Sequence, residues 1–168
     1  FPTRRSSDLE AIEALDGIVD IFLPDFKYIS SEMAARYSNA PDYPEVAKRA
    51  LAQMVKQTGD AKFDERDMMK RGVIVRHLIL PGHIKESKEA IRYLYETYGD
   101  QIYISIMNQY TPMPGIEKRF KNLGRTITQK EYDEVVDYAI DLGVENGFIQ
   151  EGETAKESFI PQFDDTGL

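Results

Sequence analysis

Charged side chains at the end of an apolar run give this chain its first candidates for chemistry. The run GIVDIFLPDFK covers residues 17–27 and ends in Asp25 and Lys27. These two side chains share one face of a strand, because strand side chains alternate with a period of two. A carboxylate and an ammonium together can hold a zwitterionic or hydroxylated ligand. They can equally form a structural salt bridge, since buried charges occur mainly in pairs, and the residues alone leave both interpretations open.

A second apolar run, GVIVRHLILPG at 72–82, is interrupted by an arginine. Arg76 shares a face with Leu78, whereas His77 lies on the opposite face. A buried guanidinium without a partner is costly, so Arg76 either pairs with a carboxylate or binds an anionic ligand group through two hydrogen bonds. We expect His77 to be a satisfied residue that faces the helices. His83, in the turn that follows, could be catalytic, but we expect it to be exposed.

The third run, QIYISIMNQY at 101–110, ends in Asn108, Gln109 and Tyr110. Amide and phenol groups at the end of an apolar strand are suited to hydrogen-bonding the edge of a ligand, and capping of a loop is the alternative. The sequence contains no phosphate-binding glycine loop, no histidine spacing typical of zinc, no nucleophile elbow and no dinucleotide fingerprint. The candidate site therefore depends on the polar ends of these three runs.

The elements that position these residues alternate along the chain. Between the three apolar runs the pattern predicts helices over about 42–57 and 87–98, and after the third run a helix over about 128–142 and a fourth strand over 147–150. Asp42 with Glu45, and Thr128 with Glu131, have the spacing of a capping box. Such alternation is typical of a parallel α/β sheet. Three or four units are too few for an eight-stranded barrel of about 250 residues, so we predict the C-terminal part of a partial barrel.

Composition narrows the classes of function. The chain has 168 residues, 29 of them acidic and 21 basic, with a formal net charge of −8, which is enough chain for one domain with a sizeable core. The acidic balance argues against a protein that mainly binds nucleic-acid phosphates. No apolar run reaches the roughly 18 residues of a membrane span, so we expect neither nucleic-acid nor membrane partners. The absence of cysteine excludes a disulfide or a thiolate metal site within these residues.

The two ends of the chain differ from the middle. FPTRRSSDL, at residues 1–9, has no apolar periodicity and lacks the features of a signal peptide. It resembles the translation of a sequencing-library adapter joined to an open reading frame, and a flexible basic arm is the alternative. We therefore expect a non-native segment at 1–9, the barrel part at 10–150 and an acidic surface tail at 151–168.

Four ordered motifs carry a resemblance to a known family. They are LPDFKY at 23–28, RGVIVRHLILPGH at 71–83, ISIMNQYTPM at 104–113 and SFIPQFD at 158–164. With these motifs the chain resembles radical S-adenosylmethionine proteins, most closely the group related to pyruvate formate-lyase activating enzyme, from about Ala11 to its end. The resemblance implies a partial (β/α)₆ TIM-like barrel with parallel strands, of which this chain supplies the fourth, fifth and sixth strands and the C-terminal helix.

The resemblance also implies an activity. In such proteins a [4Fe-4S] cluster, bound by a CxxxCxxC loop, reductively cleaves S-adenosylmethionine to a 5′-deoxyadenosyl radical that abstracts hydrogen from the substrate. The implied partners are an electron donor such as flavodoxin or ferredoxin, and either a glycyl-radical-type protein substrate or a small molecule. Asp25 and Lys27 match an Asp-x-Lys motif that contacts the ribose and the methionyl end of the cofactor. Arg76 matches an arginine at the site, and Leu78 packs near the adenine.

The sequence departs from the family pattern in two places. Tyr110 stands where activating enzymes carry a histidine, so Asn108 and Gln109 are the substitutes for that adenine contact. The second departure is the missing cysteines, because an iron–sulfur cluster needs thiolate ligands. We expect the cluster ligands in a preceding N-terminal part, and we expect the 168 residues alone to be inactive.

Two other classes of function stay open. An aldolase-like barrel would use Lys27 as a Schiff-base nucleophile, although the nearby Asp25 favours the charged form of the lysine. A half-barrel interaction module would pair with another chain through the open edge of the sheet at 17–27. We expect a cytoplasmic location, because no export signal is visible and oxygen-labile clusters suit a reducing interior.

Overall fold

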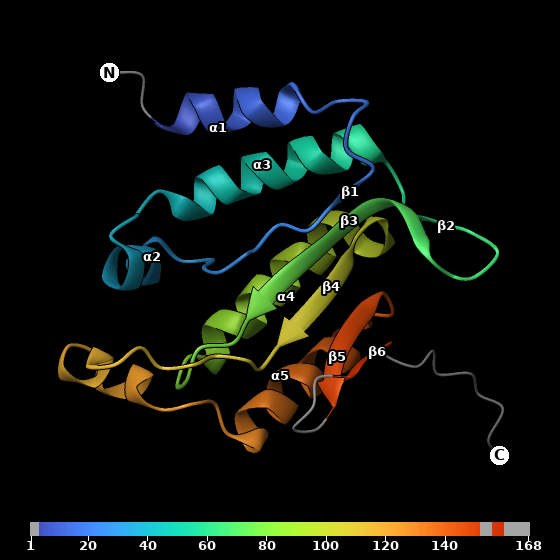
Figure 1. Ribbon diagram of the computed structural model, residues 1–168. Coiled ribbons are helices and arrows are strands. Elements are labelled where there is room, and N and C mark those ends of the chain that lie inside the picture. The colour runs from blue at the N-terminus through green and yellow to red at the C-terminus, as the bar shows by residue number, and fades with distance from the viewer. Residues whose placement is uncertain (1–3, 152–155, 160–168) are drawn as a thin grey trace, which may run out of the picture.

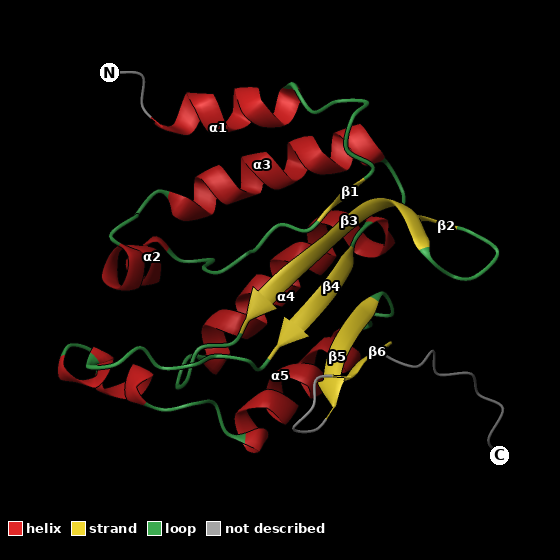
Figure 2. Cartoon of the chain, viewed as in Figure 1, coloured by secondary structure: helices red, strands yellow, loops and turns green. Residues whose placement is uncertain are grey.

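The computed structural model describes residues 4–151 and 156–159 of the chain. Its elements are labelled in Figure 1 and coloured by type in Figure 2. In chain order they are α1 (Arg4–Glu13), β1 (Ile21–Phe22), α2 (Ser31–Ser38), α3 (Tyr43–Thr58), β2 (Lys62–Phe63), β3 (Met69–Leu78), α4 (Ile84–Tyr98), η1 (Gly99–Gln101), β4 (Tyr103–Met107), η2 (Ile116–Lys118), η3 (Lys121–Gly124), α5 (Gln129–Leu142), β5 (Gly147–Glu151) and β6 (Lys156–Phe159).

One sheet organises the described part of the chain. The strand order is β1-β3-β4-β5-β6, with β2 attached to β3. The pairs β1–β3, β3–β4 and β4–β5 are parallel, which confirms the predicted parallel α/β sheet. β2 and β6 pair antiparallel with their neighbours and are not among the predicted strands. Both are short, and β2 lies in a polar segment without the apolar pattern that marks a strand.

Helices α3, α4 and α5 lie on one face of this sheet. The strand order follows the chain order from β1 to β5, so right-handed crossovers carry each connecting helix to the same face. In β3, Val73, Val75 and His77 face these helices and are buried. Arg76 and Leu78 point to the opposite face and are partly exposed. Figure 1 shows α4 and α5 behind the sheet, whose opposite face is toward the viewer.

The hydrophobic core fills the space between the sheet and its helices. Burial of these apolar side chains is the main favourable contribution to folding. The core consists of Phe22, Phe26, Leu51, Val55, Val73, Val75, Ile79, Ala90, Ile91, Leu94, Ile102, Ile104, Ile106, Tyr132, Val135, Val136, Ala139 and Val144.

The first predicted strand is shorter than its apolar run. Only Ile21 and Phe22 form a regular ladder with β3, followed by an isolated parallel bridge between Asp25 and Arg76. Pro24 lies between the two and has no N–H, so the ladder loses a hydrogen bond at that position. Pairing resumes after it, where Pro24 O accepts the N–H of Arg76 at 2.8 Å. The chain therefore stays extended up to Asp25 without forming one continuous strand.

Two of the predicted N-terminal caps are wrong, although α3 itself begins where the sequence predicts. Asp42 precedes α3 but makes no side-chain cap bond, because its backbone (φ −94°, ψ −1°) is already helical and not in the extended conformation that a cap requires. Pro44 in the first turn of α3 agrees with the sequence analysis. Helix α4 begins at Ile84, three residues before the predicted cap Ser87, which is buried inside the helix. Ser87 therefore lies on the buried side of α4 instead of capping its start.

The start of α5 agrees with the prediction. The Thr128 hydroxyl accepts the backbone N–H of Glu131, and the Glu131 side chain reaches back to the Thr128 N–H, so the capping box is complete. Gly143 ends the helix in the left-handed region at φ 95°, where glycine has no steric penalty. The boundaries of α5 thus follow from short-range sequence signals.

Parts of the two predicted end segments, 1–9 and 151–168, form helices or strands in the structure. Helix α1 begins at Arg4, inside the segment predicted to be non-native, and Gln57 in α3 donates to the carbonyl oxygen of Ile12 at 2.8 Å. Strand β6 falls in the predicted tail. Residues 1–3, 152–155 and 160–168, with most of the SFIPQFD motif, lie outside the described residues. None of the helices in the described ranges combines the length and apolar character that a bilayer span needs.

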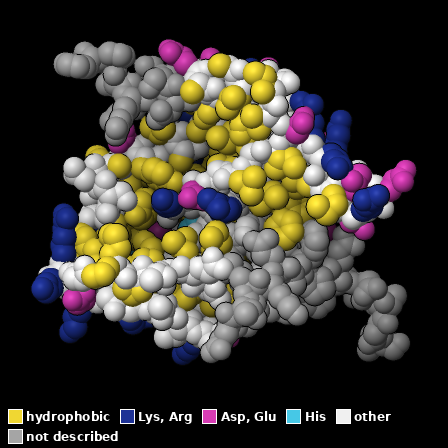
Figure 3. Space-filling view, in the orientation of Figure 1, with side chains coloured by type: hydrophobic (Ala, Val, Ile, Leu, Met, Phe, Trp, Pro, Cys, Tyr) yellow, Lys and Arg dark blue, Asp and Glu magenta, His cyan; other side chains and the backbone are white. Residues whose placement is uncertain are grey.

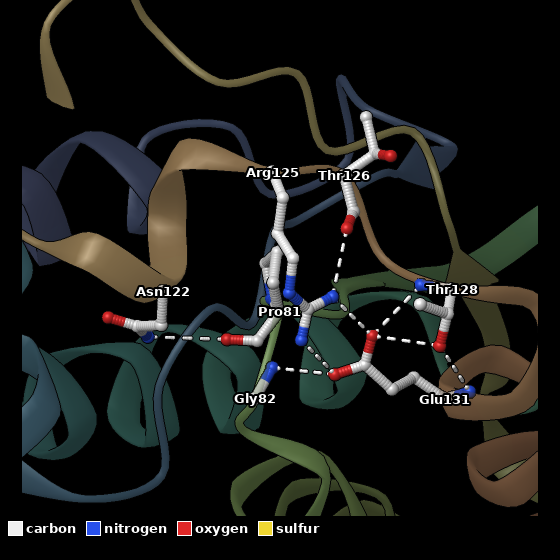
Figure 4. Close-up of polar contacts among 7 residues, drawn as sticks. All are labelled: Pro81, Gly82, Asn122, Arg125, Thr126, Thr128 and Glu131. Atoms are coloured by element: carbon white, nitrogen blue, oxygen red, sulfur yellow. Dashed lines mark hydrogen bonds and ion pairs between the residues drawn. The ribbon is translucent and has the colours of Figure 1, made fainter. Parts of the chain in front are cut away.

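The carboxylate of Glu131 joins the turn after β3 to the segment that precedes α5 (Figure 4). Its Oε1 accepts the backbone N–H of Gly82 at 2.8 Å, and Arg125 donates to Oε2 at 2.6 Å and to Oε1 at 2.8 Å. Its Oε2 also accepts the N–H of Thr128 at 2.9 Å. The hydrogen bonds from Arg125 hold the pKa of the Glu131 carboxyl well below its usual range. The turn after β3 is thereby tied to the start of α5.

We predict that Glu131→Gln lowers the free energy of unfolding by about 2 kcal/mol near neutral pH, the size expected for loss of charged hydrogen bonds and a cap. The folded-state pKa of Glu131 is lowered, so this stability is present above its unfolded pKa and is lost as the pH falls through the folded-state pKa. Urea unfolding at about pH 7 and about pH 3 measures both effects.

The matched control is Glu134→Gln in the same helix. Glu134 contacts Lys88 at 2.7 Å, but its side chain is 51% exposed, so the change should cost less than about 1 kcal/mol. Equal losses in the two variants would contradict a specific role for Glu131.

Candidate functional site

The guanidinium of Arg76 and the carboxylate of Asp25 form an ion pair on the face of the sheet that faces away from the helices. Arg76 Nε donates to Asp25 Oδ1 at 2.8 Å, and Arg76 Nη2 lies 2.7 Å from the same oxygen. The parallel bridge between the two residues sets their side chains next to each other, although 51 positions separate them. The side chains remain 43% and 39% exposed for Arg76 and Asp25, so a ligand can reach the pair.

A cavity of about 160 Å³ lies beside this pair, lined by Asp25, Lys27, Arg76, Leu78 and Met107. Lys27 Nζ is 4.0 Å from Asp25 Oδ2, and the lysine side chain is 53% exposed. Figure 3 shows hydrophobic side chains gathered over this face, with a small group of basic and acidic side chains near its middle. Four of the seven residues predicted to bind a cofactor therefore come together in one cavity of mixed charge with apolar walls.

The backbone of residues 25–27 is held from both sides. On the helix side, His77 Nδ1 lies 2.7 Å from the Phe26 carbonyl oxygen, and because a carbonyl can only accept, Nδ1 carries the proton. The Phe26 N–H donates to Arg76 O at 2.9 Å. On the other side, the Tyr43 hydroxyl donates to Asp25 O and accepts from Lys27 N–H, both at 2.9 Å. The side chains of Asp25 and Lys27 thus project from main chain that is hydrogen-bonded toward both the sheet and α3.

His77 is buried and faces the helices, as the sequence analysis expects, but only one of its two ring nitrogens has a hydrogen-bond partner in the described part of the chain. Its side chain is 1% exposed, and burial lowers the pKa of the imidazole. Its Nε2 has no hydrogen-bond partner within the described residues. His77 therefore stays neutral and acts on the site only through the Phe26 carbonyl.

The connection that follows Lys27 is fixed by a glutamate of α4. Glu86 Oε1 accepts the backbone N–H groups of Ile29 and Ser30, both at 2.8 Å. Ser30 in turn caps α2, and its side chain accepts the N–H of Met33. This contact joins the first and second β–α connections of the sheet, and no local sequence signal indicates it.

The three polar residues at the end of the third apolar run do not line this cavity. Gln109 is exposed, and Asn108 is half-buried. The Tyr110 hydroxyl donates to the carbonyl oxygen of Leu123 at 2.9 Å, and burial raises the pKa of this phenol. Tyr110 therefore fastens the loop between β4 and η3, which is the loop-capping alternative of the sequence analysis.

Met107 is a lining residue that the sequence analysis does not single out. It lies opposite Leu78 in the parallel register of β3 and β4, and Ser105 lies opposite Arg76. Both therefore share the face of the candidate site. The sequence alone shows which residues of one strand share a face. Which residues of β4 lie beside Arg76 and Leu78 depends on the register between the two strands, which the sequence does not show.

His83 is half-buried, whereas the sequence analysis expects it to be exposed. Its Nε2 lies 2.7 Å from both the Tyr37 hydroxyl and Asn122 Nδ2, and Asn122 also donates to the Pro81 carbonyl oxygen at 3.3 Å (Figure 4). An amide N–H can only donate, so Nε2 accepts and the imidazole is neutral. The expectation fails because α2 and η3 both reach this turn, with partners 46 and 39 positions away.

The described residues hold no group of three or more His, Asp or Glu side chains arranged for a metal ion. The sequence contains no cysteine. This chain consequently offers no thiolate ligand for an iron–sulfur cluster.

Comparison with known proteins adds one distant relative. No protein-family model matches the chain. It is similar to "Uncharacterized protein MJ0674" of Methanocaldococcus jannaschii, with 28% identity over 131 residues. The match covers 78% of this chain and 34% of the relative, so the chain spans about a third of the length of that protein. The name of this relative states no activity.

We predict that acid weakens this fold before its carboxylates titrate. Burial lowers the pKa of His77 and of His83 in the folded state, and the nearby Arg36 also lowers that of His83, whereas Glu86 acts in the opposite direction. Below about pH 6.5 the unfolded chain therefore binds more protons, and stability falls with a slope of at most about 1.4 kcal/mol per pH unit for each histidine.

Denaturant unfolding between about pH 7.5 and about pH 5 measures this slope. His83→Gln should make the slope shallower, because it removes one of the two titrating groups while Gln keeps a hydrogen-bonding side chain. An unchanged slope in this variant would contradict the contribution of His83.

Proposed function

We propose that this chain forms the cofactor-binding part of a radical S-adenosylmethionine enzyme, as the C-terminal part of a partial (β/α)₆ barrel. One observation carries the proposal. Asp25, Lys27, Arg76 and Leu78 come from two distant motifs and line one cavity at the carboxyl end of β3. In parallel α/β folds, ligands bind at this end of the strands.

The charges of the cavity complement the amino-acid end of S-adenosylmethionine. Lys27 and Arg76 can donate to its carboxylate, and Asp25 can accept from its ammonium or from a ribose hydroxyl. Exposed ion pairs contribute only about 0–1 kcal/mol to stability, so stability alone gives little reason for three charged groups on an otherwise apolar face. Ligand binding supplies such a reason.

The size and walls of the cavity limit what it can hold. Its volume of about 160 Å³ is below the roughly 300 Å³ of a pocket that encloses a whole ligand. It therefore fits one end of the cofactor, with Leu78 and Met107 as apolar contacts for the remainder. When bound, the cofactor supplies hydrogen-abstraction chemistry, and these residues bind and orient it.

The iron–sulfur cluster does not fit the residues of this chain, because the sequence has no cysteine. In this proposal its ligands lie outside the 168 residues. The whole protein would then work in the cytoplasm with a flavodoxin- or ferredoxin-type electron donor, on a glycyl-radical-type protein or a small molecule.

The Schiff-base alternative has less support. Nucleophilic lysines of that type work in hydrophobic pockets that exclude water. The Lys27 side chain is 53% exposed, with the Asp25 carboxylate 4.0 Å from its Nζ. Borohydride trapping with a carbonyl substrate should give no covalent adduct at Lys27.

A partner-binding module is the second candidate, and the position of β1 favours it. β1 stands at the end of the strand order, so its outer edge has no neighbouring strand in the described sheet. Ile18 and Leu23, next to β1, are large hydrophobic residues with 71% and 55% exposure. An open edge with apolar neighbours is a template for another strand. A monomeric chain that melts cooperatively would count against this candidate.

Calorimetric titration with S-adenosylmethionine tests the proposed function. We expect binding by the unmodified chain, and Asp25→Asn should weaken it at least about tenfold, because the variant loses the carboxylate and leaves Arg76 without its partner. Glu45→Gln is the control, since Glu45 is an exposed carboxylate of α3 that pairs with Lys48, at 3.2 Å, on the helix surface. No binding at about 1 mM ligand, or equal affinity for Asp25→Asn, would speak against the proposal.

A second test concerns the cluster. Anaerobic incubation of the chain with iron and sulfide should produce no cluster absorbance, because the chain has no thiolate to bind the iron. Cluster absorbance that persists after gel filtration would show that other side chains serve as ligands.

A further inference from the structure

The hydroxyl of Tyr43 bonds the main chain on both sides of Phe26, between the two charged residues Asp25 and Lys27. Tyr43 is the first residue of α3, and its hydroxyl donates to Asp25 O and accepts from Lys27 N–H, both at 2.9 Å. One side chain thus fixes the peptide units that carry two residues of the candidate site. None of the motifs in the sequence points to Tyr43.

The direction of these hydrogen bonds explains why a side chain is needed there. Along this segment Asp20 O and Pro24 O accept from β3, and Phe26 N–H donates to it, so alternate residues face the sheet. Asp25 O and Lys27 N–H consequently face the outer edge, where β1 has no neighbouring strand. The Tyr43 hydroxyl satisfies the donor and the acceptor that a neighbouring strand would otherwise pair.

The environment of Tyr43 suits this double contact. Its ring packs edge-on against Tyr28, with centroids 5.5 Å apart, so the position of the hydroxyl is fixed. Burial raises the pKa of Tyr43, and the Asp25 carboxylate acts in the same direction, although the hydrogen bond from Lys27 N–H opposes them. The phenol therefore keeps the proton that it donates to Asp25 O.

We propose that Tyr43 is a positioning residue of the candidate site, which sets the backbone of Asp25 and Lys27 so that the Asp25 carboxylate meets Arg76 and Lys27 faces the cavity. The part of the inference that concerns the cofactor rests on the proposed function. The part that concerns the backbone and the ion pair does not. Tyr43 also closes the outer edge at Asp25, so a strand added to β1 can pair only with residues before it.

Tyr43→Phe tests the inference, because phenylalanine keeps the ring and removes only the hydroxyl. Tyr28→Phe is the matched control, since its hydroxyl contacts Ser38 Oγ at 2.9 Å and not the main chain of the site. Three readouts are measured in each protein by NMR and calorimetry. They are amide hydrogen exchange of Lys27, exchange of the Arg76 Nε proton, and affinity for S-adenosylmethionine.

In the unmodified chain the Lys27 amide should be protected, although its side chain is half exposed. Tyr43→Phe should speed its exchange at least about tenfold, speed exchange at Arg76 Nε, and weaken cofactor binding about tenfold. Tyr28→Phe should change none of these. Because thermal unfolding reports global stability separately, a general loss of fold in Tyr43→Phe is distinguished from a local change.

The outcomes separate the positioning role of Tyr43 from the proposed binding of S-adenosylmethionine. An unprotected Lys27 amide in the unmodified chain, or unchanged exchange at Lys27 and Arg76 in Tyr43→Phe, overturns the positioning role even when the cofactor binds. Faster exchange at both groups in a chain that does not bind S-adenosylmethionine supports the positioning role and rejects the proposed function.

Discussion

The bridge between Asp25 and Arg76 is the contact on which the candidate site depends. Pro24 interrupts the ladder between β1 and β3, and the pairing resumes only through Arg76, whose N–H donates to Pro24 O and whose carbonyl accepts from Phe26. The same register sets the guanidinium against the Asp25 carboxylate. Without this bridge the first segment would leave the sheet before its two charged residues, and the cavity would lose one wall.

Side chains from three helices hold the main-chain segments at and beyond that bridge. Tyr43 of α3 bonds the outer side of the segment, and Glu86 of α4 bonds the backbone that follows it. Glu131 of α5 holds the turn after β3 through Gly82. An ordered scaffold of this kind allows loops at the carboxyl ends of strands to carry exposed charged groups. The site remains open to solvent while the backbone beneath it is fixed.

Periodicity and capping patterns in the sequence were sufficient to predict the general architecture. They did not predict contacts between residues that are far apart in the sequence. The alternation of side chains correctly separated Arg76 from His77, because parity within a strand is a local property. The Thr128–Glu131 box was correct for the same reason. The exposed position expected for His83 was wrong, because Tyr37 of α2 and Asn122 of η3 reach it from distant parts of the chain. Ser87 was not a cap, because α4 begins one turn earlier.

The sequence by itself therefore determined the α/β class, the face on which Asp25, Arg76 and Leu78 lie, and the boundaries of α5, all of which follow from periods and spacings of a few residues. Tertiary structure decided which charges meet. It paired Asp25 with Arg76, added Met107 to the cavity through the strand register, placed Tyr43 at the sheet edge, and left Asn108, Gln109 and Tyr110 outside. The physical reason is that contacts between distant segments depend on strand register and on the side chains that close each edge, and neither is encoded in a local pattern.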